Sequence, residues 1–302
     1  MKNKIHLPIL ITGSTGFIGS HIARYLVNYN YKVHLIIRKK SNTWRIDDFK
    51  QKSIIHYLDL LEFKKVKRLI KKIKPKTIFH LSTYGAYSFQ NDRDKIKMIN
   101  LDASINLLDA CESINFKSFI NTGTNSEYGF KNNSMREEDI LNPNSNYAVF
   151  KSAFTHYCNF ISKSKNLPII TIRPFHVYGP FEDERRLIPV LITNILKKRS
   201  PLLVDPLISR DMIYINDAIN FYIYVASKTI ERGNVYNLGS GKSHTIKEIF
   251  NIINKLLKSK VKPKWNTMKN RSWDQKIWLS NMNKVKKKYN WKTKYTLTKG
   301  LK

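Results

Sequence analysis

Short apolar runs alternate with longer segments of helical periodicity through the first part of the chain. Six of these runs are rich in β-branched residues and predict strands: 8–12, 32–37, 53–59, 77–82, 117–122 and 168–173. Four segments between them have the apolar spacing of helices: 17–29, 62–73, 93–114 and 144–164. This alternation predicts an α/β fold, with a doubly wound parallel sheet that carries helices on both faces.

The pattern becomes less regular beyond residue 174. Three shorter helices and one isolated strand are expected there: 187–198, 216–227, 245–257 and 235–239. We therefore expect residues 1–173 to form a first domain, to which residues 212–238 return. Residues 174–302 are expected to form mainly a smaller, ligand-binding region that closes over the strand ends, where ligands of open α/β sheets bind.

Composition is that of an ordinary globular protein, with 302 residues and a hydrophobic fraction of 42%. No apolar run has the length of a membrane-spanning helix, so no membrane association is expected. The basic, then apolar start resembles a signal peptide in outline, but its apolar part is needed as the first strand, which argues against targeting. Cys111 and Cys158 lie in helical patterns, so we expect no disulfide and a cytoplasmic location.

The formal net charge of +32 raises the alternative of a nucleic-acid or membrane-surface protein. The lysines are spread over many helix faces, however, as expected for a lysine-rich chain encoded by an AT-rich genome. The sequence also contains no helix–turn–helix, zinc or aromatic-basic signature. We favour solvated surfaces, no nucleic-acid partner, and a field that attracts anionic small molecules such as nucleotides.

Three glycines follow the first predicted strand at the start of the first predicted helix, in the phrase "ITGSTGFIGSH". Gly13 permits a tight turn, Gly16 lets the backbone approach a pyrophosphate, and Gly19 lets helix and strand pack closely. The spacing differs from the usual G-x-G-x-x-G, but its place after the first strand predicts a Rossmann-type dinucleotide site.

The second predicted strand ends in Arg38, Lys39 and Lys40, with no acid to bind a ribose 2′-hydroxyl. Because cations suit a 2′-phosphate, we expect NADP(H) to be preferred, with NAD(H) possible. Asp59, after the third strand, is placed to contact the adenine ring.

The phrase "NTGTNSEYG" at 121–129 could be a polar turn or half of an active site. Tyr147 and Lys151 follow it at i and i+4 of a predicted helix, and therefore lie on one face. Such a pair is common by chance in this chain. The pair becomes evidence for an active site because it follows the fifth strand, downstream of Thr124.

The chain resembles an extended short-chain dehydrogenase/reductase of the nucleotide-sugar epimerase, dehydratase and reductase group. The resemblance covers essentially the whole chain, in the order "TGSTGFIGSH", "TGTNSEYG", "YAVFK", "RPFHVYGP", "SRDMIYINDAI", "VYNLGSG" and an "R…D" after residue 270. It implies that Thr124 is the catalytic Ser/Thr, Tyr147 the proton donor or acceptor, and Lys151 its partner. A neighbouring ammonium and a nicotinamide cation would favour the phenolate of a group whose free pKa is near 10.

The resemblance also implies binding residues. Those for the cofactor are Gly13, Thr15, Gly16, Phe17, Ile18, Gly19, Arg38, Asp59, Leu60, Leu81, Ser82, Thr83, Tyr147, Lys151 and Pro174. Those for a CDP-, dTDP-, UDP- or GDP-linked sugar are Tyr84, Thr124, Ser126, Tyr147, His176, Arg210 and Arg271, the two arginines holding the diphosphate. Surface or packing roles remain the alternatives for Tyr84, His176 and the arginines, and Arg185 and Arg186 are weaker candidates. By analogy, helices 93–114 and 144–164 would pair in a homodimer.

One departure from the motifs of the family indicates which of its activities this chain is expected to have. Family dehydratases resemble "T-D-E-x-Y-G", whereas this chain has Asn125 and Ser126 at the acidic positions. Glu127 comes one place too late and is expected to point elsewhere from an extended segment. We therefore expect an NADPH-dependent 4-ketoreductase of a 4-keto-6-deoxy nucleotide sugar for surface polysaccharides. An NAD-dependent 4-epimerase is the alternative, and a non-catalytic dinucleotide-binding regulator or nucleic-acid-binding protein is a distant one.

Overall fold

The computed structural model describes residues 5–131, 133–228, 230–268 and 275–302. By its internal contacts the chain divides into two compact units. The first consists of Met1–Glu127, Pro143–Arg173 and Ile219–Tyr236, and the second of Tyr128–Asn142, Pro174–Ala218 and Asn237–Lys302. The assignment of cofactor binding to residues 1–173 and of sugar binding mainly to residues 174–302 stays a prediction.

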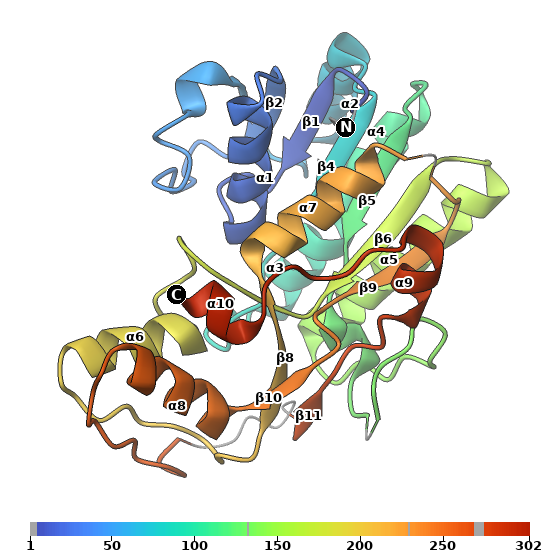
Figure 1. The fold of residues 1–302 in the computed structure, drawn as a ribbon. Helices are drawn as coiled ribbons and strands as arrows, with labels where there is room; N and C mark the ends of the chain where they lie inside the picture. The colour runs from blue at the N-terminus through green and yellow to red at the C-terminus, as the bar shows by residue number, and fades with distance from the viewer. Residues whose placement is uncertain (1–4, 132, 229, 269–274) are drawn as a thin grey trace. The chain divides into compact units, whose positions relative to one another are not determined.

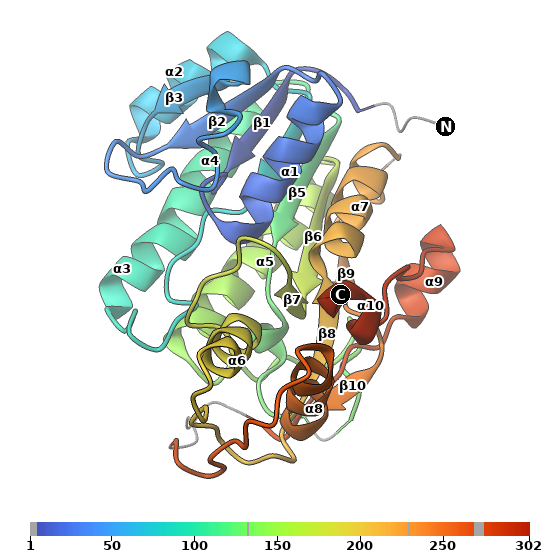
Figure 2. The same cartoon turned by 60° about the vertical axis from the view of Figure 1, so that its left-hand side comes forward.

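A seven-stranded sheet forms the centre of the first unit, in the order β3-β2-β1-β4-β5-β6-β9 (Figure 1, Figure 2). Its strands are β1 (Ile9–Thr12), β2 (Val33–Ile37), β3 (Ile54–Tyr57), β4 (Thr77–His80), β5 (Ser118–Thr122), β6 (Ile169–Pro174) and β9 (Asn234–Leu238). The pairs from β3 to β6 are all parallel. The strand order reverses between β1 and β4, so the crevice at their carboxyl ends is the topological switch point of a Rossmann-type sheet.

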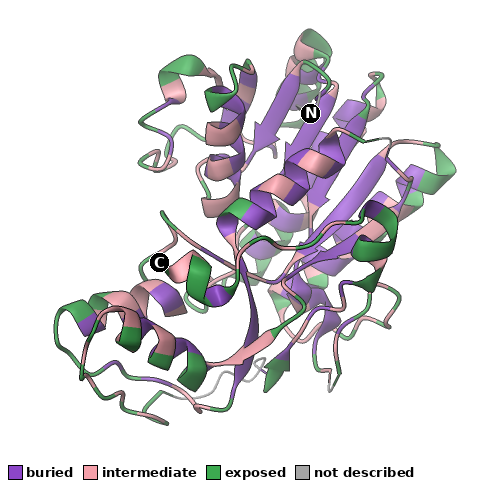
Figure 3. Ribbon diagram, in the orientation of Figure 1, coloured by how far each residue is buried: buried purple, intermediate pink, exposed green. Residues whose placement is uncertain are grey.

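Helices cover both faces of this sheet, as the sequence predicts. They include α1 (Phe17–Asn28), α2 (Phe63–Ile73), α4 (Ala103–Glu112), α5 (Asn146–Ser164) and α7 (Ile215–Ala226). On one face α2, α4 and α5 bury Val66, Leu107 and Phe154 against the strand residue Phe119. The strands β1, β2, β4, β5 and β6 are buried along almost their whole length (Figure 3), which explains why they appear in the sequence as continuous apolar runs, whereas the edge strand β3 is only half-buried.

The predicted helix at 93–114 is not one regular α-helix. It consists of α3 (Arg93–Lys97), a π-helical segment η2 (Met98–Asp102) and then α4. A π turn accommodates one extra residue per turn, which the apolar periodicity of the sequence does not reveal, and such segments are frequent at functional sites.

The second unit has a smaller sheet in which β8 is the central strand. Its strands are β7 (His176–Tyr178), β8 (Ser209–Tyr214), β10 (Ser243–Thr245) and β11 (Ile277–Trp278). Its helices are α6 (Leu187–Leu196), α8 (Ile246–Leu256), α9 (Asn283–Tyr289) and α10 (Leu297–Leu301). Thr245 caps α8 by accepting from the Glu248 amide at 3.1 Å, while the Glu248 carboxylate accepts from the Thr245 amide. Leu191 on α6 and Ile249 on α8 contribute to the core beneath the sheet.

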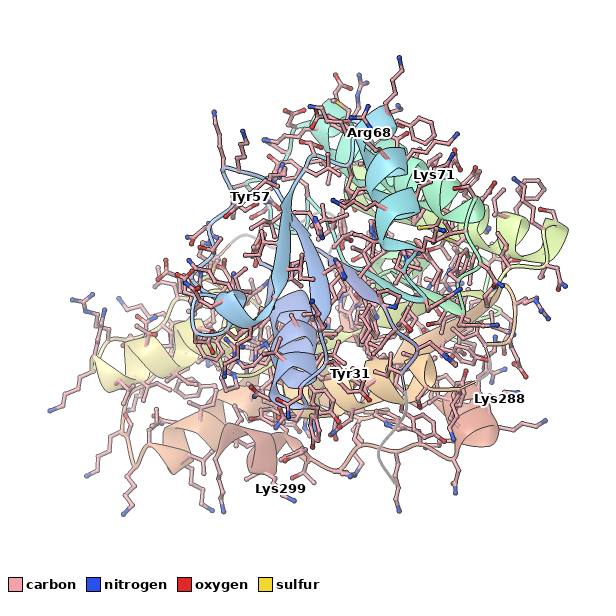
Figure 4. All side chains as sticks on the ribbon, turned by 90° about the horizontal axis from the view of Figure 1, so that it is seen from above. Tyr31, Tyr57, Arg68, Lys71, Lys288 and Lys299 are labelled. Atoms are coloured by element: carbon pink, nitrogen blue, oxygen red, sulfur yellow. The ribbon has the colours of Figure 1, made fainter. Side chains whose placement is uncertain are left out.

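The basic side chains are distributed over many elements. Figure 4 labels Arg68 and Lys71 on α2, Lys288 on α9 and Lys299 on α10, so the positive charge is not collected on one helix. Cys111 and Cys158 are free thiols in the core of the first unit. In the described ranges no helix has both the length and the apolarity needed to cross a membrane.

Candidate active site

The glycine turn joins β1 to α1 at the switch point of the sheet. Gly13 has a φ of +70°, and its carbonyl accepts from the Gly16 amide at 3.0 Å. A Cβ on Gly13 would lie 2.6 Å from the Ser82 amide nitrogen, and one on Gly19 would overlap the Gly13 carbonyl. Glycine is therefore required at 13, because the turn packs on the backbone that follows β4, and at 19, because α1 packs on the backbone of the turn itself.

The start of α1 fits a bound diphosphate. Gly16 occupies the N-cap position without any side-chain cap, and no acidic residue lies in the first turn of α1. Thr15, Phe17 and Ile18 flank this helix end, whose amides favour an anion. The buried Ser14 Oγ has no hydrogen-bond partner among the residues that the structure describes, which fits a site whose polar partner comes from a ligand.

Cations follow β2, at the place expected for the adenosine end of a dinucleotide. Arg38, Lys39 and Lys40 are all exposed there. Arg45 was not predicted from the sequence; its guanidinium donates to the Thr15 carbonyl of the glycine turn at 3.5 Å. No motif marks Arg45, because only the path of the loop between β2 and β3 brings it to the turn.

Asp59 lies directly after β3, and its Oδ1 accepts from the Leu61 amide at 3.0 Å. The side chain thus holds the turn that contains the buried Leu60. Contact of Asp59 and Leu60 with an adenine ring stays a prediction.

The loop after β4 is held by Asn100 in the π-helical segment. Asn100 accepts from the Thr83 hydroxyl at 2.8 Å and from the Tyr84 amide at 3.2 Å, and donates to the Tyr84 carbonyl at 2.6 Å. Leu81 is buried and Ser82 half-buried in this loop. Asn100 therefore positions Thr83 and Tyr84, two residues expected from the sequence to bind cofactor or sugar, although Asn100 itself was not predicted.

The predicted catalytic residues belong to the first unit: Thr124 lies between β5 and the 3₁₀ segment η3 (Asn125–Tyr128), and Tyr147 and Lys151 lie on α5. Tyr147 is half-buried in the first turn of α5, and Lys151 is buried one turn later. Thr124 is buried, and its hydroxyl oxygen accepts from the Ser126 amide at 3.2 Å. Ser126 itself is half-buried.

Lys151 is held by the end of β5. Its Nζ donates to the Thr122 carbonyl at 2.5 Å, and the Thr122 hydroxyl accepts from Tyr222 on α7 at 3.0 Å. Burial lowers the pKa of Lys151 to about 8, and the charge of Glu127 partly opposes this shift. The buried Tyr222, which interacts electrostatically with Tyr147, was not predicted from the sequence.

Two further groups complete the surroundings of Lys151. His80 hydrogen-bonds Thr12 and Ser104 at 2.7 and 2.9 Å, and burial, followed by the charge of Lys151, lowers its pKa to about 3. Glu127 is buried and pairs with Arg173 at 2.8 Å. Its segment is a 3₁₀ turn, so the extended conformation expected there is wrong, because the Thr124 hydroxyl and Glu127 carboxylate hold the backbone in a turn.

In the second unit Arg210 is buried on β8, and its guanidinium donates to the carbonyls of Ser209 and Gln275 at 3.0 and 3.2 Å. Neighbouring Asp211 accepts from the amides of Ser240 and Gly241 at 2.7 and 3.1 Å, which fixes the strand beside that loop. Arg271 lies outside the described residues.

His176 is half-buried on β7, and its ring packs edge-on to Trp278 at 6.1 Å. Its buried Nδ1 has no hydrogen-bond partner within the described part of the chain. Burial, then the charges of Arg210 and Arg186, hold the pKa of His176 well below its usual value. A neutral His176 near two cations can hydrogen-bond an anionic ligand without adding charge.

The remaining candidates occupy exposed or terminal positions. Arg185 donates to Asp183 at 2.7 Å on the surface. Pro174 ends β6 and is half-buried. Neither residue has a contact that assigns it a ligand.

These observations define a Rossmann-type α/β protein with a glycine-rich turn at its switch point. Residues 9–239 match the model of the NAD dependent epimerase/dehydratase family, and the chain belongs to this family. The fold and family inferred from the sequence are thereby confirmed.

Curated relatives carry different activities. The chain is 29% identical over 265 residues to "dTDP-D-glucose 4,6-dehydratase" of Dictyostelium discoideum, with 80% of the chain and 60% of that protein covered. It is 29% identical to "Uncharacterized UDP-glucose epimerase YtcB" of Bacillus subtilis, with coverage of 82% and 81%. It is 26% identical to "GDP-6-deoxy-D-mannose reductase" of Pseudomonas aeruginosa, with coverage of 81% and 78%.

Solved structures of similar fold include epimerases with bound ligands. A UDP-N-acetylglucosamine 4-epimerase of Methanobrevibacter ruminantium in complex with UDP-N-acetylmuramic acid has a TM-score of 0.89, with 27% identity and 99% and 96% of the two chains covered. A UDP-glucuronic acid 4-epimerase of Bacillus cereus with UDP-glucuronic acid and NAD has a TM-score of 0.87, with 26% identity and coverage of 98% and 96%.

Proposed function

We propose that the protein is an NADPH-dependent reductase of a nucleotide-activated 4-keto-6-deoxy sugar. The observation that carries this proposal is that no carboxylate is available for catalysis in the segment after β5. Asn125 and Ser126 occupy the positions where dehydratases are expected to have acids, and Glu127 is buried in an ion pair with Arg173. Without an available acid and base there, hydride transfer remains and elimination of water does not.

The preference for NADPH over NADH is supported by charge. Arg38 and Arg45 place guanidinium groups near the end of β2 and at the glycine turn. A guanidinium suits phosphate oxygens, and no carboxylate follows β2 to bind a 2′-hydroxyl.

The residues of the first unit suit ketone reduction. When bound, the reduced nicotinamide supplies a hydride to the carbonyl carbon of the sugar. Tyr147 then gives its proton to the carbonyl oxygen, while the Thr124 hydroxyl donates a hydrogen bond to the same oxygen. The Lys151 ammonium stabilises the resulting phenolate, and Lys151 and Tyr147 are expected to contact the nicotinamide ribose. Arg210 and Arg271 would bind the diphosphate of the sugar nucleotide, with His176, Tyr84 and Ser126 as further contacts.

A homodimer through α3–α4 and α5 is part of the proposal. Three large apolar side chains on these helices are exposed: Met98 at 44%, Val149 at 43% and Phe160 at 63%. Their burial against a second copy would remove apolar surface from water.

An NAD-dependent 4-epimerase is the second candidate, because the similar solved structures include epimerases of 26–27% identity. An epimerase retains its cofactor and interconverts two hexose epimers, whereas a reductase consumes NADPH. The two activities therefore differ in what an assay must supply.

The test is the loss of reduced-nicotinamide absorbance when purified protein, NADPH and a set of 4-keto-6-deoxy nucleotide sugars are mixed. Turnover with at least one ketone supports the reductase. No turnover with any of them, together with interconversion of two epimers without added cofactor, would assign the epimerase.

Tyr147→Phe should lower kcat by a factor of about 10²–10⁴, because the proton donor is removed while the ring is retained. KM for NADPH should change far less. Tyr29→Phe, the same change at an exposed position at the end of α1, is the matched control and should keep the wild-type turnover; turnover by Tyr147→Phe close to that of the wild type would refute the assignment.

A further inference from the structure

The loop between β5 and α5 contains a carboxylate that the proposed reaction does not use. Glu127 has no exposed surface, and its oxygens are fully engaged. Oε1 accepts from the Thr124 amide at 2.9 Å and from the Thr155 hydroxyl of α5 at 3.1 Å, and Oε2 accepts from Arg173 Nε of β6 at 2.8 Å. The side chain thus connects three separate elements of the first unit.

The backbone is built to admit this carboxylate. A Cβ on Gly123 would lie 2.5 Å from Glu127 Oε1 and 2.9 Å from the Thr171 methyl group. Any side chain at 123 would therefore displace Glu127 from the Thr124 amide. Gly123 directly precedes Thr124. The Glu127 carboxylate therefore fixes the backbone conformation at Thr124, and Gly123 leaves room for that carboxylate.

The position of the Thr124 hydroxyl depends on this backbone conformation. Its oxygen accepts from the Ser126 amide at 3.2 Å, a bond that exists only while residues 124–127 form the 3₁₀ turn. The Glu127 carboxylate stabilises this turn from inside, because it accepts from the amide of the first residue of the turn.

The buried Glu127 carboxylate also has an electrostatic effect on Lys151. Glu127 is a buried anion near two buried cations, Arg173 and Lys151. The charge of Glu127 raises the pKa of Lys151 against the larger lowering by burial. The other titratable groups around Lys151 are Cys158 on the same helix, whose thiol burial keeps protonated, and His80 on β4, which burial keeps neutral.

Tyr147 lies one turn before Lys151, and Tyr222 on α7 interacts with Tyr147. Burial raises the pKa of the Tyr222 phenol, so Tyr222 carries no negative charge that could pair with Lys151. Among the described residues around Lys151, Glu127 is the carboxylate whose charge opposes the lowering of the Lys151 pKa by burial, and Cys158 contributes less in the same direction.

We propose that Glu127 is a positioning residue of the active site: it fixes the Thr124 hydroxyl through the Thr124 amide, and from the same buried place it sets a carboxylate charge near the Lys151 ammonium. The role rests on the proposed function for its catalytic consequence, since Thr124 and Lys151 act on the ketone only if the protein is a reductase. A merely structural ion pair with Arg173 would stabilise the fold and leave the titration of Lys151 unchanged.

Two substitutions separate the two effects. Glu127→Gln keeps an oxygen for the Thr124 amide and removes the charge, whereas Glu127→Ala removes both. Because a lone Arg173 charge would remain buried, the double variant Glu127→Gln with Arg173→Gln is made as well, in which two neutral amides replace the ion pair. Asp217→Asn is the control, since Asp217 is also buried and accepts backbone amides, those of Lys294 and Tyr295 at 3.0 Å, and is not among the charges that shift the pKa of Lys151.

The first readout is independent of turnover. Protein labelled with ¹³C at the lysine side chains is titrated by NMR, and the Lys151 signal is assigned by its loss in Lys151→Met. Glu127→Gln and the double variant should lower the pKa of Lys151 by about half a unit or more, whereas Asp217→Asn should leave it unchanged.

The second readout is kinetic. In Glu127→Gln the alkaline limb of the kcat profile should move to lower pH by the same amount, with kcat reduced about tenfold and KM changed less than about threefold. Glu127→Ala should lose about a further tenfold in kcat, because the Thr124 turn is no longer held.

The outcomes distinguish the two proposals. A folded Glu127→Gln or double variant with the wild-type Lys151 titration would overturn the role of Glu127, whatever the enzyme reduces. If the wild type reduces no nucleotide-linked ketone but the titration shifts as expected, the electrostatic role stands and the reductase proposal fails.

Discussion

At the scale of single residues, the Lys151 charge that the proposed reaction needs also destabilises the fold. Its ammonium is buried on α5 and has a pKa of about 8, well below the ordinary value of 10.5. Keeping the charge at neutral pH therefore opposes folding. We expect Lys151→Met to abolish reduction and yet to stabilise the fold at pH 7 by about 1–2 kcal/mol, after loss of the hydrogen bond to Thr122 is counted.

The pH dependence of this gain has a definite sign. Between the folded pKa of about 8 and the unfolded value of 10.5, the unfolded chain binds more protons at Lys151. The contribution of Lys151 to folding therefore becomes more favourable as pH rises through this window. Thermal unfolding of both proteins from pH 7 to pH 10 should show the advantage of Lys151→Met shrinking. An advantage that stays constant or grows would contradict a depressed pKa.

Residue spacing in the sequence located Thr124, Tyr147 and Lys151 because each belongs to a short local phrase with a chemical meaning. The contacts of Glu127 and Tyr222 were not predicted from the sequence, for different reasons. Glu127 was visible but its burial depends on Arg173, 46 residues later. Tyr222 lies 100 residues from its partner Thr122, and no local pattern records such a contact.

At the scale of elements, apolar periodicity predicted the strands of the large sheet and most helices, because each buries a continuous run or one face. The strands β7, β10 and β11 have at most three residues, too few for alternation to appear. The π segment of residues 98–102 was also missed, although it changes the orientation of the chain at Asn100.

Asn100 gives that segment a testable role. Asn100→Ala should remove the bonds to the Thr83 hydroxyl and to the amide and carbonyl of the half-buried Tyr84, at a cost of about 2–3 kcal/mol in unfolding free energy. Because the loop after β4 is expected to contact the dinucleotide, KM for NADPH should also rise, by about fivefold or more. Ser113→Ala, which removes one bond to the Ala110 carbonyl on α4, is the control. An unchanged KM in a destabilised Asn100→Ala would restrict Asn100 to a structural role.

At the scale of the whole molecule, the charge of +32 could act as a general field or only through cations at the site. Salt separates these possibilities, since the Debye length falls to about 8 Å at physiological ionic strength. Charges spread over α2, α9 and α10 then lose most of their influence on a distant ligand, whereas cations that contact the ligand keep theirs.

We expect KM for NADPH to rise about fivefold between roughly 0.02 and 0.2 M salt in the wild type, with kcat nearly constant. The double variant Arg38→Ala with Arg45→Ala should raise KM for NADPH about tenfold at every salt concentration and KM for NADH less than about twofold, because only NADPH carries the 2′-phosphate. Arg68→Ala on the exposed face of α2 removes one comparable charge remote from the glycine turn. If Arg68→Ala weakened NADPH binding as much as the double variant does per charge removed, the field of the whole protein, rather than the cations after β2, would determine the preference.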